Sequence, residues 1–467
     1  MMRYISTRGD SPPIGFLDAV LAGLASDGGL YVPETWPHLT PEEIAGFAGM
    51  PYAQVAAHIL HRFAGDSLSA EELQSLTAEA YAGFTHAAVV PLRQLEPGLW
   101  LLELFHGPTL AFKDVAMQLL SRLYERALKA RKRTLTIVCA TSGDTGGAAV
   151  EALRGRANVR LVVLFPHGKI SEVQRRFMTT AGEANVRCIA VDGSFDDCQS
   201  IVKGLFNAQG FQQSVDLSGV NSINWARIAA QVVYYFTAAV ALGAPHRPVA
   251  FAVPTGNFGD AFAGYVAWRM GLPIERIVLA TNSNDILARA VETGRYARGA
   301  VASTISPAMD IQVASNFERL YFDAVGGEGL ETARAFRAFA EPGAIDIPPK
   351  AFAAIRQLFV GAGVSEAETS RAILTTLNSA GALIDPHTAV GVAAAKRLGP
   401  SRETTPMVVL ATAHPAKFPD AVLAAAGVAP ALPVAARGLS AKPERIARLP
   451  ADLEAVKAYI RDFAQKV

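Results

Sequence analysis

The chain has 467 residues, 51% hydrophobic and 18% charged, which is long enough for two or more domains and too apolar for a disordered protein. Its 43 Lys and Arg residues nearly balance 42 Asp and Glu residues, so the composition excludes the basic footprint of a protein that binds nucleic acid or anionic membranes. No apolar run approaches the ~20 residues of a membrane span, and the polar first ten residues lack the apolar core of a signal peptide, so we expect a cytoplasmic protein.

The first 90 residues are predicted to form an α-rich N-terminal domain. Apolar residues recur at helical spacing between Phe16 and Leu24, and again over residues 51–63 and 70–81. The last of these patterns starts with Ser-Ala-Glu-Glu, the arrangement of a capping box at a helix N-terminus.

A lysine, Lys113, stands between an apolar run at residues 99–105 and a helical pattern that begins near Asp114. Burial at such a point disfavours the charged ammonium, and the neutral amine is the form that makes a Schiff base. The alternative is a lysine whose stem lies along apolar surface while its amino group reaches water. Within the same stretch we expect Asp114 to cap the helix, and His106 either to orient the lysine loop or to contact a substrate.

Apolar strand patterns alternate with helical segments through the rest of the chain. The strand patterns lie at residues 135–141, 160–165, 186–191, 249–253, 277–280 and 407–411. Apolar strands separated by helices are typical of parallel sheets that are covered on both faces. We therefore predict an α/β fold with two open parallel-sheet domains, helices on both faces of each sheet, and the α-rich N-terminal portion.

Two strands end in glycine-rich loops that open helices, at residues 141–147 and 253–260. Glycine lets the backbone approach an anion closely, and the N–H groups at a helix start carry positive partial charge. The alternative is that these glycines only make tight strand-to-helix turns. A third loop, at residues 412–418, follows the last strand. Because ligands bind outside the carboxyl ends of the strands in open parallel sheets, these loops and Lys113 are expected to converge on one crevice.

Other kinds of site are disfavoured. Neither glycine-rich loop matches G-x-x-x-x-G-K-[ST] or G-x-G-x-x-G, which argues against nucleotide binding. No metal-ligand spacing connects the cysteines, which are Cys139, Cys188 and Cys198. They are expected to be buried, reduced thiols, and no metal site is predicted.

His387 follows Asp385 and Pro386, two residues that suit the start of a helix. The presence of this histidine is therefore explained equally well by a helix start and by a functional site.

Four motifs together resemble the threonine synthase family. They are Gly-Pro-Thr-Leu-Ala-Phe-Lys-Asp at 107–114, Ala-Thr-Ser-Gly-Asp-Thr-Gly at 140–146, Pro-Thr-Gly-Asn-Phe-Gly-Asp at 254–260 and Ala-Thr-Ala-His-Pro-Ala-Lys-Phe at 411–418. They occur in the family's order and, with Asp-Gly-Gly-Leu-Tyr-Val-Pro at 27–33, span the chain. The family consists of pyridoxal 5'-phosphate enzymes of fold type II, so the resemblance implies that cofactor and that architecture.

The resemblance also implies roles around the cofactor. Lys113 would hold pyridoxal phosphate as a Schiff base and then serve as a mobile acid and base. Thr412 would face the pyridine nitrogen. The cofactor phosphate would be bound by Gly256, Asn257, Phe258, Gly259 and Asp260. Many fold-type-II relatives have an asparagine where this chain has Asp144, and a carboxylate beside the cofactor's phenolate oxygen would have to be protonated or turned away.

The implied substrate is O-phospho-L-homoserine, whose phosphate needs a second cradle. Two stretches offer hydroxyl, amide and guanidinium groups suited to phosphate. Their candidate residues are Ser222, Asn224, Arg227, Ser315, Asn316 and Arg319. The alternative for each arginine is a surface ion pair. Ser142 and Thr145 in the first glycine-rich loop are the implied seat of the substrate carboxylate.

The implied activity is that of a lyase in threonine biosynthesis, in which γ-elimination of phosphate is followed by β-addition of water to give L-threonine. A dehydratase-like enzyme with the same cofactor and fold, acting on serine or threonine, is one alternative, and a cofactor-free paralogue that binds phosphorylated ligands is another.

We expect a small-molecule substrate, no nucleic-acid or membrane partner, and a monomer or homodimer. The expected domains are an N-terminal one at 1–90, a large cofactor-binding one at 91–114 and 221–467, and a smaller inserted α/β one at 115–220.

Overall fold

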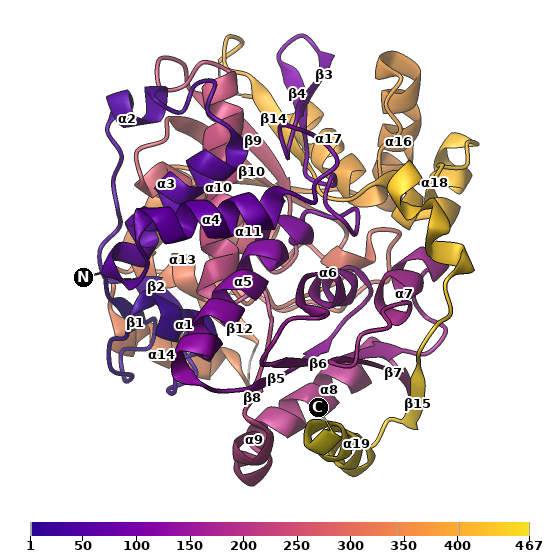
Figure 1. The fold of residues 1–467 in the computed structure, drawn as a ribbon. Helices are drawn as coiled ribbons and strands as arrows, with labels where there is room; N and C mark the ends of the chain where they lie inside the picture. Colours follow the sequence, from indigo (N-terminus) through magenta and orange to yellow (C-terminus); the bar gives the residue numbers. More distant parts are fainter. Residues whose placement is uncertain (1, 342, 401, 467) are drawn as a thin grey trace.

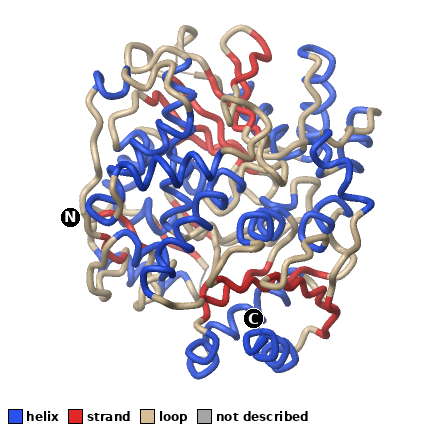
Figure 2. The backbone as a smooth tube through the Cα atoms, in the orientation of Figure 1, coloured by secondary structure: helices blue, strands red, loops and turns tan. Residues whose placement is uncertain are grey.

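The structure is a computed structural model that describes residues 2–341, 343–400 and 402–466. Within these residues two mainly parallel β-sheets lie in different parts of the molecule, with helices between and around them (Figure 1). Figure 2 shows the same division, with the strands gathered mainly into two groups among the helices. The predicted α/β fold with two parallel-sheet domains is confirmed.

The larger sheet has the strand order β13-β10-β9-β14-β4-β3. Its strands are β3 (Leu92–Glu96), β4 (Leu99–Glu103), β9 (Val249–Pro254), β10 (Ile274–Thr281), β13 (Phe359–Gly363) and β14 (Met407–Ala411). All neighbouring strands run parallel except β3 and β4, which form an antiparallel pair at one edge. The sequence patterns located four of these strands but missed β3, which has no fully buried residue, and β13, in which two of five residues are glycine.

Both faces of the larger sheet are covered, as the apolar strands predicted. The covering helices are α10 (Trp225–Ala241), α11 (Gly259–Arg269) and α12 (Ile286–Thr293) on one face and α16 (Glu366–Ala380) and α17 (Pro386–Leu398) on the other. Along β9, Val249, Phe251 and Val253 pack on the α10 side, whereas Ala250 and Ala252 pack on the α17 side. This alternation of large and small side chains lets α17 lie close to the sheet.

Gly391 lies where α17 packs closely against the sheet, and this close packing gives a stability prediction. A Cβ at this position would lie 2.8 Å from Val409 Cγ1 and 2.9 Å from Pro254 Cγ. Gly391→Ala should therefore lower the free energy of unfolding by about 1–3 kcal/mol, because an overpacked core forces its neighbours to shift. Denaturant unfolding followed by circular dichroism measures this change.

Gly210→Ala is the matched control for that variant. Gly210 lies in α9 (Gln209–Val215), and a Cβ there would meet no atom within 4 Å. This substitution should leave the free energy of unfolding unchanged or raise it by about 0.5–1 kcal/mol, since alanine favours a helix over glycine. Equal losses in the two variants would contradict the packing argument.

The smaller sheet has the order β15-β7-β6-β5-β8 and is parallel throughout. Its strands are β5 (Leu135–Ala140), β6 (Val159–Pro166), β7 (Val186–Asp192), β8 (Leu217–Ser218) and β15 (Ala447–Pro450). One face carries α6 (Asp144–Leu153) and α7 (Glu172–Thr179), and the other carries α8 (Phe195–Asn207), α9 and α19 (Leu453–Lys466) (Figure 1). The helices α6 and α7 lie on the side of this sheet that faces the rest of the molecule.

The C-terminal segment differs from the predicted domain limits, which assigned residues 221–467 to the larger domain. β15 pairs with β7 of the smaller sheet, and Val456, Ile460 and Phe463 of α19 pack in the core beneath that sheet. The chain thus returns to the smaller domain at its end. A four-residue edge strand with no fully buried residue carries too little apolar pattern for sequence reasoning to place it.

The N-terminal portion is rich in helices and packs around α10 and α5 (Lys113–Arg131). Its elements are β1 (Tyr4–Ser6), α1 (Phe16–Ala22), β2 (Tyr31–Pro33), α2 (Pro41–Ala45), α3 (Tyr52–Ala64), η1 (Gly65–Ser67) and α4 (Ala70–Tyr81). The predicted capping box is confirmed, since Ser69 and Glu72 cap α4 reciprocally. The remaining elements are β11 (Arg295–Ala297), η2 (Pro307–Met309), α13 (Phe317–Ala324), α14 (Gly329–Phe339), β12 (Ala344–Asp346), α15 (Pro349–Arg356), η3 (Pro415–Lys417), α18 (Pro419–Ala426) and η4 (Val434–Ala441).

The start of α5 corrects one prediction, because Asp114 is not the N-cap of this helix. The carboxylate lies inside the first turn and accepts hydrogen bonds from Thr109 N at 2.7 Å and Thr109 Oγ1 at 2.6 Å. A Cβ at Gly107 would lie 2.4 Å from the Asp114 Cβ, so a glycine is needed there. Asp114 therefore closes the loop before Lys113 and fixes where that lysine enters the helix.

Candidate functional site

Loops from two neighbouring strands of the larger sheet meet at its carboxyl edge. The loop after β4 leads to Lys113, and the loop after β14 carries Thr412. Phe112 N donates a hydrogen bond to Thr412 O at 2.8 Å, and His414 N donates to Leu110 O at 3.0 Å, so the two loops run side by side. The structure thus brings the lysine loop and the threonine loop together, as expected for loops that follow the carboxyl ends of parallel strands.

Lys113 is a buried lysine with 9% of its surface exposed, and its amino group faces a carboxylate. Its Nζ lies 3.4 Å from Asp144 Oδ2 and 4.8 Å from the centre of the Phe112 ring. Burial lowers the pKa of Lys113, the Asp144 carboxylate raises it, and the positive charges of Lys417 and Arg227 lower it further. The net direction is downward, which favours the nucleophilic neutral amine.

Asp144, in the first glycine-rich loop, is a carboxylate whose two oxygens are both engaged. Oδ1 lies 2.9 Å from Lys417 Nζ and accepts a hydrogen bond from Gln174 Nε2 at 2.9 Å, while Oδ2 faces Lys113. Burial alone would raise the pKa of Asp144, but the ammonium groups of Lys417 and Lys113 hold it well below its usual range. Asp144 need not be protonated to be buried, because two cations balance its charge.

Sequence reasoning missed Lys417 and Gln174. Lys417 is fully buried in η3, and its Nζ also donates to Thr109 O at 2.7 Å. Gln174, in α7, reaches Asp144 because Gly143 has no side chain; a Cβ there would lie 2.5 Å from the Gln174 Cδ. Lys417 belongs to the 411–418 motif, so a signal for it existed, whereas nothing in the sequence around Gln174 pointed to the site.

The second glycine-rich loop leaves the N-terminus of α11 open. Phe258 adopts φ of 63°, α11 begins at Gly259, and no side chain caps this start. A Cβ at Gly256 would lie 3.1 Å from Ala308 O and 3.2 Å from the Met309 Cα, so the loop has no room for a larger residue there. Uncapped N–H groups at a helix start are suited to a phosphate group.

Asn316 joins this loop to the stretch before α10. Its backbone N and Nδ2 donate to Asn257 O at 3.2 and 3.0 Å, and Nδ2 also donates to Ser222 O at 3.3 Å. The Asn316 side chain is buried, whereas Ser315 is exposed. Asn316 therefore links the second glycine-rich loop, through Asn257, to the stretch that contains Ser222.

Arg319 is buried, contrary to the alternative of a surface ion pair, but its donors contact the protein. Nε donates to Tyr31 O at 3.0 Å, Nη2 donates to Ile223 O at 2.6 Å, and Nη1 donates to Asn316 Oδ1. Its guanidinium also lies 5.7 Å from the Trp225 ring centre. Arg319 thus fastens the N-terminal portion and the Asn316 link to the start of α10.

Arg227 is also buried but has few partners. Nη1 donates to Val220 O at 3.2 Å, and Nε has no hydrogen-bond partner. Among the residues that the structure describes, no carboxylate forms an ion pair with Arg227. Burial lowers the pKa of Arg227 to about 10. Because a buried cation without a counter-charge is costly, this guanidinium indicates an anionic ligand.

Three other residues were predicted to bind the substrate, and the structure gives them different surroundings. Asn224 is the N-cap of α10, with Oδ1 accepting from Ala226 N at 3.0 Å and Nδ2 donating to Val20 O at 2.8 Å. Its amide is therefore used to position α10. Ser142 and Thr145 are partly exposed at the N-terminus of α6, where both hydroxyls and backbone N–H groups can meet a carboxylate.

Asp260 follows the second glycine-rich loop, but its carboxyl group faces α10. Oδ1 accepts hydrogen bonds from Tyr234 OH and, at 3.3 Å, from Tyr235 OH. Burial raises the pKa of Asp260 to about 7, although both tyrosine hydrogen bonds lower it. The side chain thus anchors the start of α11 to α10 instead of pointing along the loop.

Asp260→Asn should remove a pH dependence of folding stability. An unfolded aspartate titrates near pH ~4, so between that pH and about 7 the folded chain holds the additional proton. The stability that this proton supports is present below pH ~4 and is lost as the pH rises to about 7. From about pH 5 to about pH 8 the wild type should lose ~2 kcal/mol relative to the variant. Thermal unfolding at both pH values measures this difference, and identical pH responses would contradict it.

Two candidate histidines contact protein groups. His387 Nδ1 lies 2.7 Å from Asp385 Oδ2, and its Nε2 accepts from Ala308 N at 3.2 Å. Asp385 caps α17, so the helix-start interpretation is confirmed, and His387 additionally holds the loop that covers Gly256. His106 Nε2 lies 2.8 Å from Glu103 Oε2, which fixes its ring at the start of the lysine loop.

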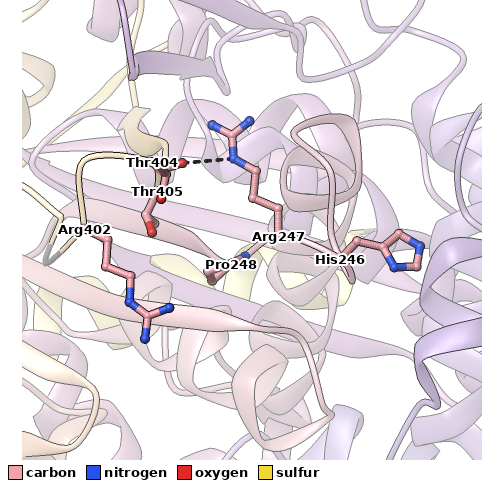
Figure 3. Close-up of a pocket in the computed structure, with 6 residues that line it drawn as sticks. All are labelled: His246, Arg247, Pro248, Arg402, Thr404 and Thr405. Atoms are coloured by element: carbon pink, nitrogen blue, oxygen red, sulfur yellow. Dashed lines mark hydrogen bonds between the residues drawn. The ribbon is translucent and has the colours of Figure 1, made fainter.

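A hollow of about 550 Å³ lies at the opposite edge of the larger sheet (Figure 3). It is lined by His246, Arg247, Pro248, Arg402, Thr404 and Thr405. Pro248 and Thr405 come just before β9 and β14, so the hollow lies at the amino ends of these strands, away from Lys113. Arg247 Nε donates to Thr404 O at 3.1 Å (Figure 3). The residues that line this hollow include neither Lys113 nor the glycine-rich loops of the candidate site.

None of the described helices is both long and apolar enough to cross a membrane. Over residues 2–341, 343–400 and 402–466, no three His, Cys, Asp or Glu side chains are grouped so as to hold a metal ion. Cys139, Cys188 and Cys198 are buried free thiols, as predicted.

Comparison with known proteins also points to threonine synthases, with matches in the N-terminal, central and C-terminal parts of the chain. Residues 3–81 match the family description "Threonine synthase N terminus", residues 83–343 match "Pyridoxal-phosphate dependent enzyme", and residues 388–460 match "Threonine synthase, C-terminal". The threonine synthase of Pseudomonas aeruginosa is 50% identical over 466 residues, covering 100% of this chain and 99% of that protein.

Solved structures agree with these matches. The crystal structure of PLP-bound threonine synthase from Brucella melitensis has 51% sequence identity and a TM-score of 0.97, and each chain is covered completely. The crystal structure of threonine synthase from yeast has 38% identity and a TM-score of 0.94, covering 100% of this chain and 99% of that one. Sequence and fold are therefore similar from one end to the other.

Proposed function

The chain belongs to the threonine synthase family, and we propose that it converts O-phospho-L-homoserine and water to L-threonine and phosphate with Lys113 as its catalytic residue. It is a pyridoxal-phosphate-dependent enzyme of fold type II. The observation that carries the substrate proposal is the buried Arg227 guanidinium, which lacks a carboxylate partner among the described residues and lies within electrostatic range of Lys113. A phosphorylated amino acid supplies the missing negative charge.

The residues of the site fit the cofactor. Lys113 is buried with a lowered pKa, which suits covalent attachment of an aldehyde. The uncapped start of α11 at Gly259, with Gly256, Asn257 and Phe258 before it, suits the cofactor phosphate. Thr412 lies on the loop that runs beside Lys113 and is the candidate partner of the pyridine nitrogen. When bound, pyridoxal phosphate supplies an electron sink for charge that develops at the substrate's α-carbon.

We assign the proton transfers to Lys113 Nζ. As a neutral amine it takes the proton from the substrate's Cα, and the lowered pKa of Lys113 favours this form. Asp144 Oδ2, 3.4 Å away, stabilises Nζ while it carries the proton. Because the Asp144 carboxylate is also bonded to Lys417 and Gln174, its own position stays fixed as Lys113 changes charge.

We assign the substrate phosphate to Arg227 and Ser222, and the substrate carboxylate to Ser142 and Thr145. The overall reaction breaks the C–O bond between Cγ and the phosphate and one C–H bond at Cβ, and it forms a C–O bond from Cβ to the oxygen of water and a C–H bond at Cγ. Arg227 would stabilise the phosphate as it leaves, because a planar guanidinium binds two of its oxygens at once. Asn316, together with Asn224 and Arg319, would act indirectly by holding the loops in place.

The direct test is to incubate the purified protein with O-phospho-L-homoserine and measure phosphate and L-threonine in equal amounts. Equimolar products support the proposal. Turnover of L-serine or L-threonine with no phosphate release from O-phospho-L-homoserine would favour the dehydratase-like alternative instead. A protein that binds phosphorylated ligands but no pyridoxal phosphate would favour the cofactor-free alternative.

We further propose a cytoplasmic location, which the three buried free thiols support, since such thiols persist in a reducing compartment. The expectation of a monomer or homodimer also stands as a proposal. Light scattering of the purified protein tests it, and a larger assembly would overturn it.

A further inference from the structure

Lys417 is a second buried lysine at the site, and the proposed reaction leaves it without a role. It is fully buried in η3, at the carboxyl edge of the larger sheet. Its Nζ lies 2.9 Å from Asp144 Oδ1 and donates to Thr109 O at 2.7 Å. Burying a second ammonium group beside a reactive lysine is costly unless its charge is used, which calls for a physical reason.

The geometry around Asp144 supplies that reason. The carboxylate is shared unequally, because Oδ1 has close contacts with both Lys417 and Gln174 at 2.9 Å, whereas Oδ2 is 3.4 Å from Lys113. The two lysines reach Asp144 from different parts of the fold, since Lys113 begins α5 and Lys417 follows β14. Asp144 itself belongs to the smaller domain, at the start of α6.

We propose that Lys417 is a positioning residue: by occupying one oxygen of Asp144 and placing a fixed positive charge beside Lys113, it keeps Lys113 only loosely paired and its amine available for reaction. The proposal rests on Lys113 being the reactive lysine of the proposed function. It adds a role that the motif resemblance did not assign to Lys417.

Burial and the positive charges around Lys113 also favour its neutral amine. Burial lowers the pKa of Lys113, Asp144 opposes this, and the positive charge of Lys417 supports it. Without Lys417, Asp144 would pair with Lys113 alone and the repulsion would vanish, so both changes would favour the protonated amine. The other titratable or charged groups that face this cluster are Asp114, Arg227, Asp260, His387 and His414.

The test measures protonation of Lys113 without using catalysis. The full-length protein is freed of pyridoxal phosphate and labelled with trace acetic anhydride over a range of pH, and mass spectrometry quantifies the peptide that contains Lys113. The pH of half-maximal labelling reports deprotonation of that amine. Lys417→Met should raise this pH by about one unit or more relative to the wild type.

Three further variants separate this role from a purely structural one. Lys417→Arg keeps the positive charge and should restore the wild-type midpoint. Lys203→Met removes an exposed lysine of α8 and should leave the midpoint unchanged. Asp144→Asn removes the shared carboxylate and should lower the midpoint, since two cations then repel without a counter-charge. If Lys417→Met does not fold, as judged by circular dichroism, the double variant Lys417→Met/Asp144→Asn decides the question, because its midpoint should lie above that of Asp144→Asn if the charge of Lys417 acts on Lys113 and should equal it if not.

A midpoint that stays at the wild-type value in Lys417→Met would overturn the proposal, as would a midpoint that rises or does not move in Asp144→Asn. Lys417 would then serve only to hold the Thr109 loop. These outcomes are distinct from failure of the proposed function, because labelling depends neither on the substrate nor on turnover. A protein that does not release phosphate from O-phospho-L-homoserine would refute the substrate assignment and leave the labelling result intact.

Discussion

Lys113→Ala should abolish covalent attachment of pyridoxal phosphate and lower kcat for phosphate release by about 10⁴-fold. The variant loses the amine that attaches the cofactor and the group that moves the substrate's α-proton. The loss should appear mainly in kcat, because the groups assigned to the substrate phosphate and carboxylate remain. Borohydride trapping followed by mass spectrometry measures attachment, and a phosphate assay measures turnover.

Two companion variants make this result specific. Lys203→Ala removes an exposed lysine from α8 and should keep both attachment and kcat at wild-type levels. Lys113→Arg keeps a positive charge near Asp144 but has no readily available neutral amine, so it should be as inactive as the alanine variant. Trapping of the cofactor on any other lysine of an active Lys113→Ala protein would refute the assignment.

Arg227→Gln should lower kcat/KM for O-phospho-L-homoserine by about 10²–10³-fold, with a large increase in KM. The reason is the burial of this guanidinium with no carboxylate partner among the described residues. A neutral amide at the same place cannot balance a phosphate that enters from water, so binding of substrate suffers most. Steady-state kinetics at several substrate concentrations separate KM from kcat.

The form of the defect identifies what Arg227 recognises. Arg227→Lys should fall between wild type and Arg227→Gln, because it keeps the charge and loses the bidentate geometry. Arg247→Gln, in the hollow at the opposite edge of the sheet, is the control and should have wild-type kinetics. Unchanged kinetics with O-phospho-L-homoserine in Arg227→Gln, together with turnover of unphosphorylated L-serine or L-threonine, would rule out the proposed substrate.

The larger-sheet strands that the sequence located are those buried on both faces. β9 consists only of buried residues, as does β14, and such unbroken apolar runs are recognisable without tertiary information. β3 and β15 escaped prediction because edge strands bury little, and β13 because its glycines interrupt the apolar pattern. Domain limits failed at the C-terminus for the same reason, since β15 is the element that returns the chain to the smaller sheet.

At the site, the groups predicted from sequence are those with a signal in a few neighbouring residues or in a motif of the family. Gly256 and the open start of α11 were predicted from glycine spacing after a strand, whereas the place of Lys113 between a strand and a helix left two interpretations open and the motif resemblance chose between them. The Asp114 cap prediction was wrong because the loop before α5 folds back, which lets Thr109 reach this carboxylate. A pattern of consecutive residues cannot show that the loop folds back onto the helix start.

The sequence by itself determined the fold class and indicated the loops suited to anions, because strand burial, helix starts and glycine turns are properties of a few consecutive residues. Lys113 became the candidate Schiff-base lysine through the resemblance of four ordered motifs. Only the tertiary structure decided which charges meet. Lys417 lies far from Lys113 along the chain, yet both contact Asp144. The tertiary structure also distinguished Arg227 from Arg319, although each arginine follows an asparagine by three residues. Arg319 has protein acceptors for its donors, whereas Arg227 Nε has no hydrogen-bond partner. The physical reason is that burial and pairing of charge depend on every element packed around a group, and these come from distant parts of the chain.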